Sequence, residues 1–167
     1  MKNLLFLSGM TLMLLLGSCS NPTDYNTAII NQVSSVITEK DNLLRLLQEQ
    51  KFDEVQAALD RGKERSQKAL ERLEGMSAFR GDDSLRLAAI DFVSFYNRLF
   101  SNEEILKVAD FAKRGEQFTI EENERLFQVL SGIFEEENAV TIKLSEVHNA
   151  FVEKNGLLRF DYFQPRN

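Results

Sequence analysis

The sequence is poor in several residue types on which common folds and sites depend. Its 167 residues include one Cys, two Pro, one His and no Trp. A single Cys excludes an internal disulfide framework and any zinc or iron–sulfur site built from several cysteines. The formal charge of −6 argues against a nucleic-acid-binding protein, which needs basic side chains to replace counterions. Few prolines and an apolar content of 43% predict one folded domain with its own core.

Catalytic and metal-binding patterns are also scarce. His148 is the only histidine, and Ser145 stands three residues before it, where a di-iron bundle would need Glu. Pairing His148 with Met76 around a haem has no further support in the sequence. No Gly-rich phosphate loop, serine-nucleophile motif or paired-carboxylate motif is present. We therefore predict a protein that is not an enzyme and needs no cofactor or metal, with His148 on a partly exposed flank of its helix. An active site of carboxylates that meet only in the folded protein stays open.

The first twenty residues have the pattern of an export signal. Lys2 supplies a positive charge, and the following residues 4–16 are predominantly apolar. Such a run fits the apolar region of a signal peptide and is too short to span a membrane. It ends in Leu16-Gly17-Ser18-Cys19, which resembles the lipobox of bacterial lipoproteins.

The lipobox resemblance implies cleavage between Ser18 and Cys19 and the attachment of acyl chains such as palmitate to Cys19. A chance cysteine after an ordinary signal peptide is the alternative. Each buried CH₂ contributes about 0.8 kcal/mol, so several acyl chains hold a protein firmly on a bilayer. Ser20 does not resemble an inner-membrane retention signal, so an outer-membrane destination is implied, on either its periplasmic or its outer side. The chain then divides into a signal peptide (1–18), a lipidated tether (19–23), a helical domain (24–156) and a tail (157–167).

From Tyr25 onward, apolar residues recur every three or four positions, as they do on amphipathic helices. The predicted fold is all-α, an up-down-up-down four-helix bundle of long antiparallel helices. Cap residues place the helix starts near Thr23 or Asp24, near Asp53, within 82–84 and near Thr119. Thr119-Ile120-Glu121-Glu122 forms a capping box, and Gly156 ends the last helix. We favour a third helix that continues with a bend to about residue 113, although residues 101–104 also fit a capping box.

The predicted core consists of one apolar stripe on each helix. The first stripe also contains Lys40 and the fourth contains Glu137, and we predict that these two residues form an ion pair across the bundle. The stripes, in chain order, are Tyr25, Ile29, Val33, Val36, Leu43, Leu44 and Leu47; Phe52, Val55, Leu59, Gly62, Ser66, Ala69, Leu73 and Met76; Leu85, Ala88 or Ala89, Phe92, Phe95 or Tyr96, Leu99, Leu106 and Ala109; and Leu126, Leu130, Ile133, Val140, Leu144, Val147 and Phe151.

Small residues on the second stripe face the aromatic residues of the later helices. Complementary packing is the first interpretation, in which large side chains fill the space beside Gly62, Ser66 and Ala69. The alternative is a carrier of a small apolar molecule, with Phe92 and Tyr96 completing the lining of its pocket. The last aromatic residues, Phe160, Tyr162 and Phe163, either fold back over the end of the bundle or form an exposed binding segment.

Cys19, the segment Asp24-Tyr25-Asn26 and the amphipathic helix that follows carry a broader resemblance. The chain is similar to uncharacterised all-helical surface lipoproteins of spirochaetes and Bacteroidota. This resemblance implies a lipid-anchored bundle of unassigned function and brings no catalytic residues with it. The expected partners are the membrane, through the N-terminal lipid, and an envelope protein or glycan.

Overall fold

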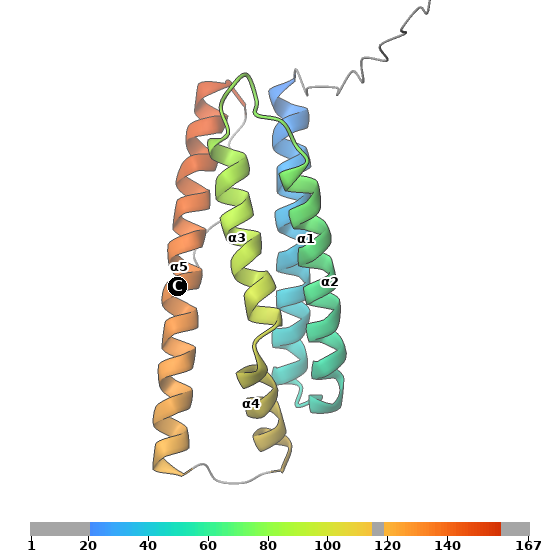
Figure 1. The fold of residues 1–167 in the computed structure, drawn as a ribbon, viewed down its shortest axis with the longest axis vertical. Coiled ribbons are helices and arrows are strands. Elements are labelled where there is room, and N and C mark those ends of the chain that lie inside the picture. The colour runs from blue at the N-terminus through green and yellow to red at the C-terminus, as the bar shows by residue number, and fades with distance from the viewer. Residues whose placement is uncertain (1–20, 115–118, 158–167) are drawn as a thin grey trace, which may run out of the picture.

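A computed structural model describes residues 21–114 and 119–157, and its regular structure there is helical (Figure 1). The all-helical prediction is confirmed for this part of the chain. Residues 1–20, with Ser18 and Cys19, and residues 158–167, with the last aromatic residues, lie outside the described ranges. The helices are α1 (Pro22–Gln48), the short 3₁₀ helix η1 (Phe52–Glu54), α2 (Val55–Glu74), α3 (Ser84–Phe100), α4 (Glu103–Arg114) and α5 (Ile120–Lys154).

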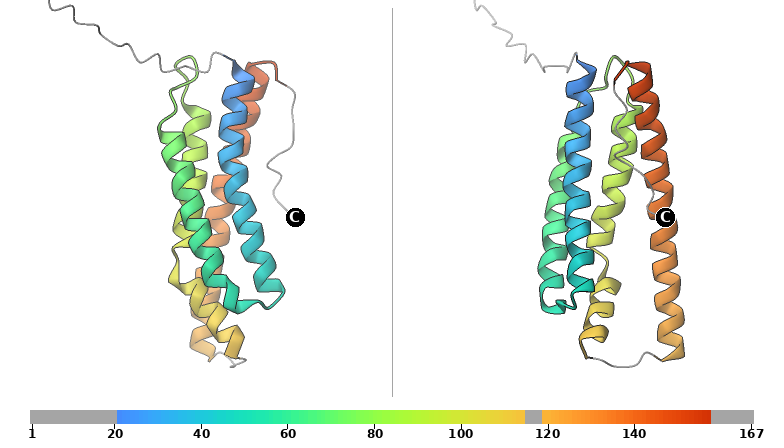
Figure 2. Two further views of the ribbon diagram at one scale, coloured as in Figure 1. Left: turned by 90° about the vertical axis from the view of Figure 1, so that its right-hand side faces the viewer. Right: turned by 180° about the vertical axis from the view of Figure 1, so that it is seen from behind.

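The long helices run side by side and alternate in direction (Figures 1 and 2). α1, α2 and α3 pack against one another, and α5 packs along α3. α4 extends beyond α3 and contacts η1 and α2. As a result, the start of α1 and the end of α5 lie at one end of the molecule, and α4 and the start of α5 lie at the other (Figure 1).

Most of the predicted stripes form the core. The small and apolar residues of α2 from Val55 to Leu73 are buried as predicted, and Phe92, Phe95 and Tyr96 of α3 are at most 3% exposed. Three aromatic rings close the core at the end near residue 21. The Tyr25 ring centroid lies 5.2 Å from that of Phe79 and 5.7 Å from that of Phe151. Such aromatic contacts add to the stability gained from burial alone.

The predicted ends of α5 are confirmed. The Thr119 hydroxyl accepts a hydrogen bond from the Glu122 amide (3.2 Å), and the Glu122 carboxylate accepts one from the Thr119 amide (2.8 Å). At the other end, Gly156 adopts a φ of +63°, a left-handed conformation that terminates helices. The start of α1 differs from the prediction, since the side chain of Asn21 is the cap and Pro22 and Thr23 are already helical. Proline suits this first turn because its missing N–H would have no helical partner.

The predicted continuous third helix is wrong, and the alternative of two helices is correct. α3 ends at Phe100 and α4 begins at Glu103. The side-chain oxygen of Asn102 accepts a hydrogen bond from the Glu104 amide (2.9 Å), which starts a new helix. Because of this break, α4 does not continue α3 as one helix. Instead, α4 contacts η1 and α2.

Two smaller predictions are also corrected. Asp53 does not cap α2, because residues 52–54 form η1 and the Asp53 carboxylate pairs with Lys113 of α4. Leu44 is 42% exposed, whereas Leu46, which the predicted stripe omitted, is 1% exposed. Leu43 and Leu46 are three positions apart and therefore share the inner side of α1, and Leu44 lies at its edge.

Candidate functional site

A polar cluster joins three helices in the middle of the molecule. Lys40 of α1 lies 3.3 Å from the carboxylate of Glu137 of α5, which confirms the predicted ion pair. The sequence interpretation missed the third member, Tyr96 of α3, whose hydroxyl donates a hydrogen bond to the same carboxylate oxygen. The Lys40 amine also lies 5.9 Å from the centre of the Tyr96 ring, within the range of a cation–π contact.

The geometry of this cluster indicates a structural role. Its charges satisfy each other, and the side chains of Lys40 and Glu137 are only 19% and 29% exposed. A partly buried pair of this kind adds little net stability but penalises arrangements in which the helices slide and the charges separate. We conclude that the cluster fixes the register of α1, α3 and α5.

The small residues of α2 are matched by large side chains of α3. A Cβ atom on Gly62 would lie 2.6 Å from the ring of Phe100, so a larger residue there would force the ring to move. The buried Ser66 hydroxyl accepts a hydrogen bond from the Asn97 side chain (2.9 Å). Ala69 is likewise buried. These contacts favour complementary packing at Gly62 and Ser66, and the carrier function stays a prediction.

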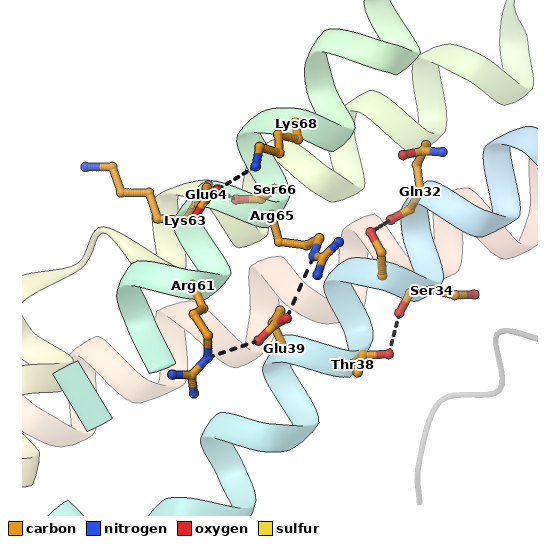
Figure 3. Close-up of polar contacts among 11 residues, drawn as sticks. Gln32, Ser34, Thr38, Glu39, Arg61, Lys63, Glu64, Arg65, Ser66 and Lys68 are labelled. Carbon is orange, nitrogen blue, oxygen red and sulfur yellow. Dashed lines mark hydrogen bonds and ion pairs between the residues drawn. The ribbon is translucent and has the colours of Figure 1, made fainter. Parts of the chain in front are cut away.

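A shallow charged depression of about 190 Å³ lies on the surface between α1 and α2 (Figure 3). Glu39 sits between two guanidinium groups, 4.0 Å from Arg61 and 3.8 Å from Arg65. Beside it, Lys68 donates a hydrogen bond to Glu64 and lowers the pKa of that carboxyl group. The spacing of Arg61 and Arg65, four residues apart, could have indicated this cluster from the sequence. Because its cations already face carboxylates, the depression acts as a link between α1 and α2.

The prediction of a partly exposed His148 is wrong. Its side chain is 2% exposed, and burial lowers the pKa of the imidazole. The reason is that the buried side of α5 widens near its end, where Val152 is also buried one turn after His148. At neutral pH the imidazole is therefore uncharged.

The first half of α5 carries an exposed apolar face that the sequence interpretation did not identify as such. We call it the α5 apolar face and define it as Ile120, Phe127, Leu130 and Phe134, with exposed fractions of 78%, 72%, 50% and 62%. The residues recur at helical spacing, so their side chains share one side of α5. Single exposed apolar residues are common on protein surfaces, but a contiguous row is typical of an interaction site.

Leu130 was predicted to be a core residue, and the structure corrects this. The prediction assumed a third helix long enough to cover α5 over its whole length. Instead, the break at Asn102 directs α4 toward η1 and α2. Glu137, which faces α1, follows Phe134 by three residues and Leu130 by seven, so the α5 apolar face continues the α1 side of the helix.

Other features of the described residues give no site. Among them, no three His, Cys, Asp or Glu side chains are grouped so that they could hold a metal ion. No helix in the described ranges is long and apolar enough to cross a membrane. Comparison of the chain with protein families, with curated protein sequences and with solved structures found no match.

Proposed function

We propose that this chain is a lipid-anchored lipoprotein of the bacterial outer membrane, and that its bundle is a non-enzymatic interaction or scaffold module. The observation that carries the interaction role is the α5 apolar face, which exposes two phenylalanines and two aliphatic residues at one end of the molecule. The lipid anchor rests on the lipobox resemblance of residues 16–19. We further propose that α3 and α4 together take the place of the third helix, which makes the domain an up-down-up-down four-helix bundle.

The positions of the two features fit a tethered interaction module. α1 begins at Pro22, three residues after Cys19, so an anchor at Cys19 would hold the start of α1 close to the bilayer. The 27 residues of α1 extend the molecule by about 40 Å from that end. The α5 apolar face lies at the opposite end (Figure 1). In this orientation it lies far from the anchoring membrane, where other components of the envelope, whether protein or glycan, can reach it.

Substitution of Cys19 tests the anchor. We expect Cys19→Ala to abolish incorporation of labelled palmitate, to block cleavage of the signal peptide and to change the membrane fractionation of the protein. Ser20→Ala is the matched control, because it leaves the acceptor thiol in place. If Cys19→Ala partitions with membranes and is processed like the unmodified chain, the lipoprotein proposal is wrong.

Crosslinking in intact envelopes tests the interaction role. We expect the unmodified chain to form crosslinked products with an envelope protein or glycan. A chain with Phe127→Ser and Phe134→Ser should lose those products, because both side chains are exposed and their loss leaves the core intact. Recovery of no protein and no glycan from intact envelopes would contradict an interaction or scaffold module.

A further inference from the structure

The α5 apolar face has an acidic border. Glu124 and Glu135 are exposed on its outer side, with the exposed Gln128 between them. Gln128 follows Glu124 by four residues and precedes Glu135 by seven, so all three lie on one side of the helix. The only cation between Ile120 and Ile142 is Arg125, which pairs with Glu104 of α4 (2.9 Å). Whatever covers the apolar face therefore meets carboxylates along its edge.

The aromatic residues of the tail do not reach the far part of the α5 apolar face. The Leu157 amide donates a hydrogen bond to the Val152 carbonyl, which fixes where the tail begins. Phe163, the last aromatic residue, follows Leu157 by six residues and reaches at most about 22 Å. Phe127 precedes Val152 by 25 residues of helix, or about 37 Å.

A second copy of the chain is also a poor occupant. In an antiparallel pair of α5 helices, Glu124 of one copy would lie near Glu135 of the other. That arrangement brings like charges together at the interface, which opposes association. In a parallel pair the two acidic borders would lie on opposite flanks of the interface, and there the net charge of −6 on each copy opposes association.

We propose that the α5 apolar face binds a cationic amphipathic helix of an envelope protein. Apolar side chains spaced three or four residues apart on that helix would contact Phe127, Leu130 and Phe134, as in other helix-in-groove complexes. Lysine or arginine residues along one edge would face Glu124 and Glu135. This inference rests on the proposed function, which supplies an envelope partner and places the face far from the anchoring bilayer.

Site-specific photocrosslinking in the full chain, expressed in its own cells, tests the proposal. Benzoylphenylalanine replaces Phe127 in the test protein, and replaces Leu87 of α3 or Ile142 of α5 in the controls, where both native side chains are 49% exposed. We expect illumination to link position 127 to a peptide with a net positive charge and apolar residues at helical spacing. The yield at positions 87 and 142 should be at least tenfold lower.

Charge reversal at the acidic border is the second part of the experiment. Glu124→Lys together with Glu135→Lys should lower the crosslink yield from position 127 at least fivefold. Glu71→Lys with Glu74→Lys makes the same change in net charge on exposed positions of α2 and should leave the yield unchanged.

Several outcomes would overturn the proposal. One is a crosslink to a second copy of the chain, to lipid, or to a neutral or acidic segment. The others are the absence of any crosslink and an equal loss of crosslink yield in both charge-reversed variants. Failure of the lipid anchor is a separate result, since it is measured by palmitate incorporation at Cys19. Normal anchoring with no cationic partner would reject this inference and leave the anchor proposal standing.

Discussion

Gly62 and Gly132 both lie inside helices, but their surroundings are opposite. Ala at position 62 would put a Cβ atom against the Phe100 ring, close to its attachment point, whereas nothing lies within 4 Å of the corresponding atom at position 132. Overpacking costs about 1–3 kcal/mol, and the helix propensity of Ala recovers about 1 kcal/mol. In urea unfolding we expect Gly62→Ala to lose up to about 2 kcal/mol and Gly132→Ala to gain about 0.5–1 kcal/mol. Equal gains at both positions would contradict the close packing of Phe100 on α2.

His148 should make the protein sensitive to mild acid. Burial lowers the pKa of its imidazole in the folded state, so the unfolded state binds the proton more readily. Its contribution to stability is complete above the ordinary histidine pKa of about 6.5 and is lost as the pH falls below that value. Between about pH 7.5 and pH 5 we expect the Tm of the unmodified chain to fall further than that of His148→Gln. Parallel Tm curves for the two proteins would show that His148 does not contribute to the pH dependence.

At the level of helices, Glu137 and its neighbour Glu136 offer a matched comparison. Glu137 accepts from Tyr96 and Lys40, which belong to two other helices, whereas Glu136 forms an exposed pair with Arg98 of α3. Removal of Glu137 leaves the buried Tyr96 hydroxyl without this acceptor, at a cost of about 1–3 kcal/mol. An exposed pair contributes less than about 1 kcal/mol. In thermal or urea unfolding, Glu137→Ala should therefore destabilise the protein more than Glu136→Ala, and the reverse order would contradict the bridging role.

The sequence predicted features that depend on a few neighbouring residues. The capping box at Thr119, the stop at Gly156 and the stripe of α2 are local patterns, and the structure confirms them. The Lys40–Glu137 pair was predictable because two charges interrupted otherwise apolar stripes. The break in the third helix was left open, because periodicity continues through Ser101 and Asn102 while residues 101–104 also fit a capping box, and the cap hydrogen bond of Asn102 decides it. Features that depend on a neighbouring helix, such as the hydrogen bond from Tyr96 to Glu137, were missed.

At the scale of the whole molecule, that one break accounts for the exposed end of α5. α4 follows η1 and α2, so the first half of α5 lacks the neighbour that covers its second half. The same apolar spacing therefore buries Leu144 and leaves Leu130 half exposed. Periodicity predicts that a stripe exists, but burial depends on the length and direction of the helices opposite it. This is why sequence reasoning placed Leu130 in the core and did not identify an interaction surface.

This asymmetry predicts that α5 opens from its first residue rather than uniformly. Local opening costs less where a helix buries few side chains, and residues 120–136 include none that is fully buried, whereas Leu144, His148, Phe151 and Val152 are. In hydrogen exchange read by mass spectrometry, peptides from 120–136 should exchange at least tenfold faster than peptides from 141–153. A partner helix bound to the α5 apolar face would bury that segment and slow its exchange, with little change in the second half. Uniform protection along α5 in the isolated protein would contradict both the asymmetry and the idea that this end is completed by a partner.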